Sequence, residues 1–365
     1  MSSNFGKYLR VTVFGQSHST AIGTVVEGLP PGIPIDMAYI QQFMARRAPG
    51  GSNLSTPRKE ADQVQILSGV AGSVTCDAPL AAIIHNTNTR PGDYDNLRYT
   101  PRPGHSDYTA GIHSGGMCDL SGGGHFSGRL TAPLCFAGAV CSRYLQGLGV
   151  RVVAHIASIA GVQDTPLNPL QLDDNLANEL EQKPLAVIDD IAGDKMQQAI
   201  LTARSQGDSV GGSIECAIYG LPAGLGEPMF ETVEGMLAYA MFGIPAIKGI
   251  EFGSGFAGTN LTGSQNNDPF AIKDGRVITT TNHCGGVLGG ITTGMPVVFR
   301  VGVKPTPSIA KPQQTVHLQT SQPCQIAVQG RHDPCIVPRA VPVVQAVAAA
   351  VATDLILGGK AHGIK

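Results

Sequence analysis

Three segments of the chain place a titratable side chain beside glycine, proline or arginine, a combination suited to acid–base chemistry on an anionic ligand. The first segment, residues 15–18, reads GQSH, and we expect His18 at the tip of a hairpin, where an imidazole can reach a ligand and titrates near neutral pH. Taken alone, this motif is explained better by an exposed loop histidine. It is no G-x-S-x-G nucleophile elbow, because Ser19 replaces the last glycine and a strand should follow.

The second segment reads RPGHSD at 102–107, with SGGGHFSGR close behind at 121–129. Three glycines leading into an expected helix would expose backbone N–H groups near its N-terminus, which is an anion site in physical terms. A flexible loop explains the glycines equally well on local grounds. The segment contains neither G-x-G-x-x-G nor GxxxxGK[ST], so it supports neither a Rossmann fold nor a P-loop.

The third segment reads GRHDPC at 330–335, with Arg339 downstream. Either it is a solvated turn, or cations hold Asp333 in place as a base. Residues 304–308, KPTPS, form a rigid segment suited to a phosphate or to the polar edge of a flavin. Further cations recur in or beside glycine- and proline-rich loops, which fits a focused pocket for polyanions, although ordinary surface positions explain part of them: Arg46, Arg47, Arg58, Lys59, Arg90 and Arg102.

Composition limits the class of protein. The 365 residues include 47 Gly and 25 Pro without a three-residue period, and 42% are hydrophobic, which excludes collagen and disfavours disorder. The net charge of −2 gives no global reason to bind nucleic acid or an anionic membrane. The eight cysteines form no CxxC and no zinc-like spacing, so we expect reduced, mostly buried thiols in a cytoplasmic protein without a metal. The N-terminus shows no apolar signal segment.

Hydrophobic patterns then indicate the elements that must position these residues. A hairpin is expected over 9–14 and 21–28, and further strands over 152–159, 210–219 and 297–303. One helix is expected to begin after an N-cap at Asp36 and to end at the Pro/Gly stop 48–51, and others are expected over 130–148, 189–204, 231–242 and 341–357. The last helix should be buried and should not span a membrane, because Pro342, Gln345 and Asp354 interrupt its apolar run. This mixed order predicts an α+β fold with antiparallel sheets, in one domain over 1–365.

Read together, the motifs resemble the chorismate synthase family along nearly the whole chain. The segments that carry the resemblance are FGQSH, PPGIPID, RRAPG, STPRKEAD, LSGV, RPGHSDYT, the GGG loop, GDSVGG, GSQN, TNHCGGVLGGITTG, KPTPSIAKPQQTV and GRHDPCIVPRAVPVVQA. The resemblance implies a layered β-α-α-β sandwich, with helices between two antiparallel sheets, that assembles as a homotetramer. It implies a lyase of aromatic amino acid biosynthesis that removes phosphate and a proton from 5-enolpyruvylshikimate 3-phosphate and requires reduced FMN. Whether the protein reduces its own flavin with NADPH is left open.

The resemblance also implies site residues. His18 would protonate the leaving phosphate, His105 would lie beside the flavin, and Asp333, together with the flavin N5, would take the substrate proton. Contacts to FMN are implied for His125, Phe126, Ser127, Pro245, Ala246, Gly289, Lys304, Pro305, Thr306, Pro307, Ser308 and Arg331. Substrate anions would meet Arg47, Arg129 and Arg339.

The chain departs from the family pattern at several of these places. GESHG is GQSHS here, RRRPG is RRAPG, and RGGGRSSAR is SGGGHFSGR, which introduces Ala48, His125 and Phe126. Asn53 stands where an arginine commonly follows the Pro-Gly pair. Because His18, His105 and Asp333 are all present, we expect an active enzyme, and the departures lead us to expect a different flavin affinity. A flavin-binding protein or flavin reductase of the same fold, without the elimination activity, is the alternative; an anion-binding protein without catalysis is a third hypothesis.

Overall fold

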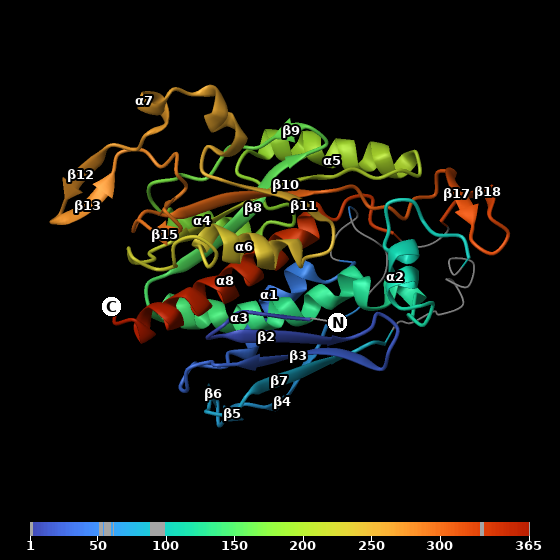
Figure 1. Cartoon of the computed structure of the whole chain (residues 1–365), viewed down its shortest axis with the longest axis horizontal. Coiled ribbons are helices and arrows are strands. Elements are labelled where there is room, and N and C mark those ends of the chain that lie inside the picture. Colours follow the sequence, from blue (N-terminus) through green and yellow to red (C-terminus); the bar gives the residue numbers. More distant parts are fainter. Residues whose placement is uncertain are drawn as a thin grey trace.

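The computed structural model describes residues 3–50, 54, 60, 62–87, 99–328 and 332–364. Two five-stranded antiparallel sheets form the outer layers, and helices fill the space between them (Figure 1). Helix α3 lies against the first sheet, α8 and α6 lie against the second, and α1 packs against both α3 and α8. The predicted α+β sandwich with β-α-α-β layers is therefore confirmed.

The first sheet has the strand order β1-β2-β3-β7-β4. Its strands are β1 (Asn4–Phe5), β2 (Arg10–Gly15), β3 (Ala21–Glu27), β7 (Leu80–His85) and β4 (Val64–Ser68). The predicted hairpin is confirmed as β2–β3, in a register that pairs Arg10 with Glu27 and Gly15 with Ile22. This register places His18 in the short turn at one end of the sheet.

The second sheet has the order β11-β16-β10-β8-β9. Its strands are β11 (Ile247–Phe252), β16 (Val297–Val303), β10 (Gly212–Tyr219), β8 (Arg151–Ile159) and β9 (Val162–Gln163). Eight of the nine residues of β8 are buried, because α8 packs against β8 and both α4 and α5 also contact it. A strand enclosed in this way has a nearly continuous apolar sequence.

Four helices form the interior layers: α1 (Met37–Arg47), α3 (Thr131–Gly147), α6 (Val233–Phe242) and α8 (Val337–Ala361). The helix predicted over 231–242 begins two residues later, because the Thr232 side chain caps it by accepting a hydrogen bond from Gly235 N–H. Helices α3 and α8 approach closely at Gly138, where a Cβ would overlap Ala346. Helix α8 is long and apolar enough to cross a membrane, but its most apolar window is 94% buried within the fold. The prediction of a buried helix is confirmed.

The remaining helical elements lie at the periphery: α2 (Asp107–His113), α4 (Asp174–Gln182), α5 (Asp190–Ser205), α7 (Gly263–Asn266), and the 3₁₀ turns η2 (Ser121–Phe126), η3 (Gly128–Leu130) and η4 (Gly255–Asn260). The short strand pairs are β5 (Val70–Ala71) with β6 (Val74–Thr75), β12 (Phe270–Lys273) with β13 (Arg276–Thr279), β14 (Val287–Leu288) with β15 (Ile291–Thr292), and β17 (Gln313–His317) with β18 (Gln322–Ile326). The β12–β13 and β17–β18 hairpins extend from opposite ends of the sandwich (Figure 1). All eight cysteines are free, and Cys135, Cys141, Cys216 and Cys335 are buried.

Candidate functional site

The two predicted catalytic histidines face one glycine loop at the end of the sandwich that carries α2. The β2–β3 turn joins this loop through a hydrogen bond of 3.0 Å from Ser17 N–H to the Gly124 carbonyl. A Cβ at Gly122 would overlap the His18 ring, and a Cβ at Gly123 would lie 3.4 Å from the His105 ring. The loop therefore brings together His18 and His105, which are 87 positions apart in the sequence.

The backbone of this loop requires glycine. Gly122, Gly123 and Gly124 have φ angles of 60°, 86° and 53°, in the left-handed region that is costly for residues with a side chain. A Cβ at Gly124 would also overlap the Asp119 carbonyl. The glycines thus allow the backbone to approach both histidines closely, as expected for a ligand cradle.

A buried ion-paired corner holds His105. Its Nδ1 lies 2.6 Å from Asp107 Oδ1, and Asp107 also accepts hydrogen bonds from Arg102 Nε and NH2, each at 2.7 Å. Burial alone would raise the pKa of Asp107, but hydrogen bonds from Arg102 and His105 outweigh it and hold that pKa well below its usual range. Arg102 NH1 donates to Ser308 Oγ at 3.0 Å, which links this corner to the 304–308 segment.

The 304–308 segment lies next to Ala246 and to the loop that carries His105. Lys304 N–H donates to the Ala246 carbonyl at 3.0 Å, and Lys304 Nζ donates to the Gly104 carbonyl, one residue before His105. Burial lowers the pKa of Lys304, and the nearby charge of Lys248 adds to this effect. The buried Thr306 Oγ1 has no hydrogen-bond partner among the described residues. This hydroxyl and the Lys304 ammonium are groups that a polar ligand could engage.

The described residues of the third sequence segment, His332 and Asp333, lie near the corner formed by residues 102–107. The buried Nε2 of His332 has no hydrogen-bond partner within the described part of the chain. Burial lowers the pKa of His332, and the charges of Arg102 and His105 contribute to this shift, so the 102–107 corner and His332 act on one another. The neighbouring Asp333 forms an ion pair with Arg339 in the first turns of α8.

The three arginines predicted to bind substrate form one network. Arg339 Nε donates to the Arg47 carbonyl at 2.9 Å. Arg47 NH1 lies 2.5 Å from Asp62 Oδ2, and Arg129 NH1 pairs with the other oxygen of the same carboxylate and, at 2.9 Å, with Glu60. Burial alone would raise the pKa of Asp62, but the charges of Arg47 and Arg129 lower it. Asp62 thus fixes two guanidinium groups beside each other, and Glu60 supplies a second carboxylate to Arg129.

Some predicted residues have other roles or lie elsewhere. Both ring nitrogens of His125 are engaged, Nδ1 with the Gly15 carbonyl at 2.8 Å and Nε2 with Ser3 Oγ at 2.9 Å. Ser127 Oγ accepts a hydrogen bond from Arg129 N–H, and Phe126 is 37% exposed. Arg331, together with Arg58, Lys59 and Arg90, lies outside the described residues.

Gly289 is separated from the rest within a single copy of the chain. It occupies the β14–β15 turn, whose Gly290 carbonyl accepts a hydrogen bond from Val233 N–H at the N-terminus of α6. Ala246 follows the C-terminus of that helix. Its carbonyl accepts a hydrogen bond from Lys304 N–H, and Lys304 comes directly after the C-terminal end of β16. The seven residues of β16 span about 20 Å, so the structure does not bring Gly289 to the 304–308 segment of its own chain.

The assembled site combines acid–base groups with buried cations. His18, His105 and Asp333 can move protons, and Arg47, Arg129, Arg339 and Lys304 can stabilise carboxylates and phosphates. The close glycine cradle and the orphaned Thr306 and His332 atoms fit a large polar ligand such as a flavin mononucleotide. Sequence reasoning assigned no role to Asp62, Asp107 and His332, although each lies in a motif quoted above: STPRKEAD, RPGHSD and GRHDPC respectively.

The sequence comparisons agree on one family. The sequence profile of the chorismate synthase family matches residues 9–357. Among the relatives, a chorismate synthase of Korarchaeum cryptofilum is 45% identical over 353 residues, which cover 97% of both chains. A chorismate synthase of Dehalococcoides mccartyi is 43% identical over 357 residues, covering 98% of this chain and 97% of the relative. One of Methanosarcina barkeri is 44% identical over 353 residues, covering 97% and 95%.

A crystal structure of chorismate synthase is similar to this fold. The TM-score is 0.74 at 27% sequence identity, and the match covers 97% of this chain and 93% of the other.

Proposed function

Because the chain belongs to the chorismate synthase family, we propose that it carries out the net 1,4-elimination of phosphate and a proton from 5-enolpyruvylshikimate 3-phosphate, with reduced FMN bound in the site described above. The product would be chorismate, the precursor of the aromatic amino acids. The observation that carries this proposal is the convergence of His18 and His105 on one glycine loop, beside the Asp333–Arg339 pair.

Departure of phosphate requires positive charge or a proton at the leaving oxygen. His18 is placed in the β2–β3 turn to donate that proton, and the packed Gly122 backbone fixes the position of its ring. Arg47 and Arg129 would bind substrate anions through the guanidinium hydrogens that remain after their bonds to Asp62, Glu60, Thr131 Oγ1, Asn86 Oδ1 and backbone carbonyls. Their fixed spacing orients the substrate before the reaction begins.

Asp333 would accept the substrate proton. Its partner Arg339 is held by the Arg47 carbonyl, so the base and the substrate arginines keep a constant relationship. Arg339 would also contact a substrate carboxylate. Proton removal would require that the substrate carbon lie within reach of Asp333.

His105 and the segment from Lys304 to Ser308 would hold the flavin, with contacts from Pro245, Ala246, Phe126 and Ser127. When bound, reduced FMN would lend electron density to the allylic system and recover it, which accounts for a redox cofactor without net oxidation. The Lys304 ammonium would bind the phosphate or a polar edge of the flavin. The Asp107–Arg102 pair fixes the His105 ring beside it. Arg331 belongs to the same proposed set, and Gly289 could join only from another copy.

Further parts of the proposal are a homotetramer, a cytoplasmic location and possible use of NADPH as the reductant. They rest on membership of the family.

Phosphate release tests the central proposal. Purified protein with photoreduced FMN and 5-enolpyruvylshikimate 3-phosphate, under anaerobic conditions, should release phosphate and form chorismate. Oxidised FMN serves as the control and should give no release. Bound reduced flavin without phosphate release would instead favour the flavin-binding or flavin reductase alternative, and absence of flavin binding would contradict both.

A further inference from the structure

His125 comes directly after the three glycines of the loop that faces His18 and His105, and its side chain is half-buried. Its Nδ1 lies 2.8 Å from the Gly15 carbonyl oxygen, and its Nε2 lies 2.9 Å from Ser3 Oγ. The protein itself engages both ring nitrogens, so neither is left for the flavin contact that the family resemblance implies. The function of His125 must therefore lie in the two segments that its ring connects.

These partners determine where the ring carries its hydrogen. A carbonyl oxygen only accepts hydrogen bonds, so Nδ1 of His125 donates to Gly15. In the neutral ring, Nε2 then keeps a free electron pair and accepts the hydroxyl hydrogen of Ser3. Ser3 is itself held against the first sheet, because its carbonyl accepts a hydrogen bond of 2.8 Å from Val13 N–H in β2. The ring thus joins the glycine loop to β2, directly through Gly15 and indirectly through Ser3.

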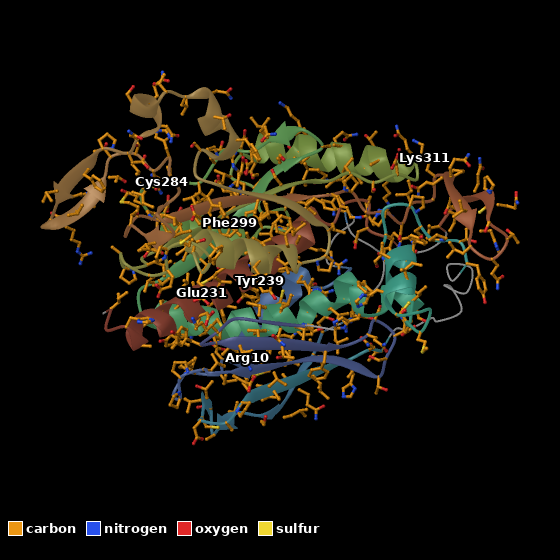
Figure 2. All side chains as sticks on the ribbon, viewed as in Figure 1. Arg10, Glu231, Tyr239, Cys284, Phe299 and Lys311 are labelled. Carbon is orange, nitrogen blue, oxygen red and sulfur yellow. The ribbon has the colours of Figure 1, made fainter. Side chains whose placement is uncertain are left out.

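The bond to Gly15 falls where β2 leads into the turn that carries His18. Strand β2 begins at Arg10 (Figure 2) and ends at Gly15. Gly15 has a φ of 99°, and a Cβ at this position would overlap the Ala21 carbonyl on the other side of the hairpin. This tight left-handed position sets the direction of the Gly15 carbonyl. His125 therefore binds the chain at the last strand residue before the turn.

A second hydrogen bond joins the same two segments. Ser17 N–H donates to the Gly124 carbonyl at 3.0 Å, and Ser17 is only 1% exposed. Adjacent residues of the loop, Gly124 and His125, thus hold two residues of the turn that lie on either side of Gln16. With two bonds the turn has one orientation on the loop, whereas with one bond it could rotate about that contact. Supporting hydrogen bonds of this kind keep a functional side chain in its productive geometry.

We propose that His125 is a positioning residue: through the Gly15 carbonyl it orients the β2–β3 turn, and with it the His18 ring, and it does not bind the flavin. The Gly122 backbone supports the ring itself, because a Cβ at Gly122 would overlap it. The glycine loop therefore holds both the His18 ring and the turn that carries the ring. The expected effect on turnover rests on the proposed function, in which His18 donates a proton to the leaving phosphate; the expected effect on the turn does not.

Asparagine and glutamine separate the two bonds of the ring. The side-chain nitrogen of asparagine is as many bonds from Cβ as Nδ1 of histidine, and that of glutamine is as many bonds from Cβ as Nε2. His125→Asn should therefore keep the bond to the Gly15 carbonyl and lose the contact with Ser3. His125→Gln should keep the contact with Ser3 and lose the bond to Gly15. Circular dichroism checks that both variants fold.

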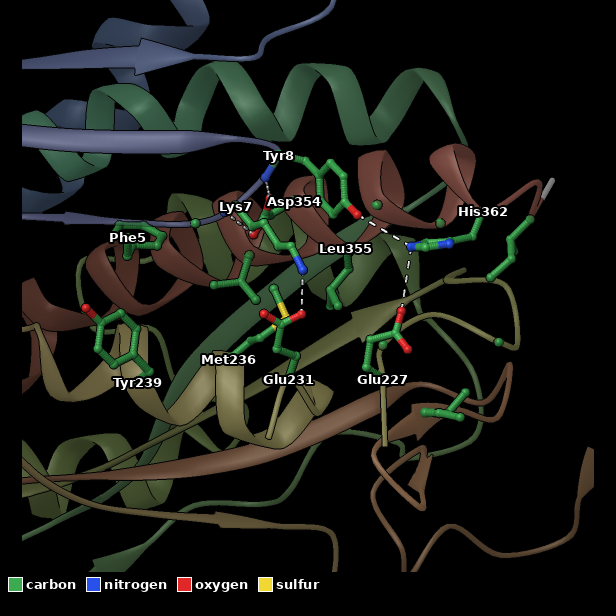
Figure 3. A pocket seen from close by; sticks show the side chains of 18 residues that line it. Phe5, Lys7, Tyr8, Glu227, Glu231, Met236, Tyr239, Asp354, Leu355 and His362 are labelled. Carbon is green, nitrogen blue, oxygen red and sulfur yellow. Dashed lines mark hydrogen bonds and ion pairs between the residues drawn. The ribbon is translucent and has the colours of Figure 1, made fainter. Parts of the chain in front are cut away.

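Hydrogen exchange measures the turn without flavin or substrate. Exchange at Ser17 N–H should be ~3- to 10-fold faster in His125→Gln than in the wild-type protein, the effect of losing one hydrogen bond, and should be unchanged in His125→Asn. The control is His362→Gln, which should leave this exchange unchanged. His362 lines a cavity of about 470 Å³ between the N-terminal segment, α6 and the end of α8, where its ring lies 3.4 Å from Tyr8 Oη and 3.7 Å from Glu227 (Figure 3). Wild-type exchange at Ser17 in His125→Gln would overturn the proposal.

Turnover distinguishes positioning from flavin binding. With saturating reduced FMN and 5-enolpyruvylshikimate 3-phosphate, His125→Gln should lower kcat ~10- to 100-fold, as expected for a displaced catalytic group. The KM for the substrate and the Kd for reduced FMN should stay within about 2-fold of the wild-type values, and His125→Asn and His362→Gln should retain at least about half of the wild-type kcat. A raised Kd for reduced FMN with full kcat at saturation, or an equal loss of kcat in both His125 variants, would refute the proposal. If the wild-type protein releases no phosphate, the proposed reaction fails, and exchange at Ser17 still decides whether His125 holds the turn.

Discussion

Asp333 and Arg339 form an ion pair at the N-terminus of α8, six positions apart in the chain. The Arg339 guanidinium also donates to the Arg47 carbonyl at 2.9 Å. Arg339 therefore connects Asp333, the proposed base, to the C-terminal end of α1, where Arg47 is a proposed substrate ligand. Any movement of α8 relative to α1 would change the position of the base and of the substrate contact together.

Asp333→Asn tests the assigned base. The amide keeps the size of the side chain but cannot accept the substrate proton, so turnover should fall about 10²- to 10⁴-fold. Binding of reduced FMN, measured by its absorbance change, should persist. Asp208→Asn, which removes a partner of Lys311 on the surface, serves as the control and should retain turnover. Wild-type turnover by Asp333→Asn would remove Asp333 from the mechanism.

Gly122→Ala tests the contact between the glycine loop and His18. Its Cβ would overlap the His18 ring and displace it, so turnover should fall at least 10-fold. Gly115→Ala is a matched control, because Gly115 has the same φ of 60° but no atom within 4 Å of its Cβ position. In both variants the left-handed conformation costs ~1–2 kcal/mol of folding stability. Only in Gly122→Ala should turnover fall further than this loss of stability explains. Equal turnover in the two variants would show that the His18 contact is unimportant.

The β-branched hairpin and the long apolar helices could be predicted because local patterns determine them. The strands β12 and β13 were not predicted, since Phe270 and Ile272 are exposed and no buried face produces a pattern. Strand β7 was not predicted either, because its residues, LAAIIH, form a nearly continuous apolar run without alternation. Strands that are exposed or buried on both faces therefore cannot be predicted from alternation of apolar and polar residues.

The site shows the same limit. His18, His105 and Asp333 lie in motifs that combine a titratable residue with glycine, proline or arginine, but their proposed roles came from the resemblance to the family. The role of Asp62 could not be predicted, although Asp62 ends the STPRKEAD motif, since only folding places its carboxylate between Arg47 and Arg129. A carboxylate that acts by holding two distant cations leaves no spacing signal in the sequence.

Asp62→Asn should therefore affect both stability and substrate binding. Removal of the shared carboxylate leaves two buried guanidinium groups without their common counter-charge, which costs roughly 3–5 kcal/mol in comparable buried pairs. We expect a lower melting temperature and a rise in KM for 5-enolpyruvylshikimate 3-phosphate that exceeds the fall in kcat. Asp174→Asn is the control, because its carboxylate is 70% exposed in a surface pair with Arg151, and it should change neither. An unchanged KM and melting temperature in Asp62→Asn would contradict the bridging role.

His155 lies in a buried cluster away from the proposed active site. Its Nδ1 is 3.0 Å from Asp164 and its Nε2 is 3.1 Å from Glu215. Asp164 also accepts hydrogen bonds from Ile188 N–H and Asp189 N–H, so the cluster joins β8 and β10 to the start of α5. Burial alone would lower the pKa of His155, but hydrogen bonds to Asp164 and Glu215 outweigh it and raise the pKa.

The stability of the protein should depend on this charge at alkaline pH. A raised pKa in the folded state means that the imidazolium contributes its full stabilisation below the unfolded value of about 6.5 and loses it as the pH rises through the folded value. His155→Gln lacks this titration. The difference in melting temperature between the wild-type protein and His155→Gln should be largest near pH 6 and should shrink towards pH 9, since the other titrating groups are common to both. A difference that grows with pH would mean that His155 is neutral in the folded protein.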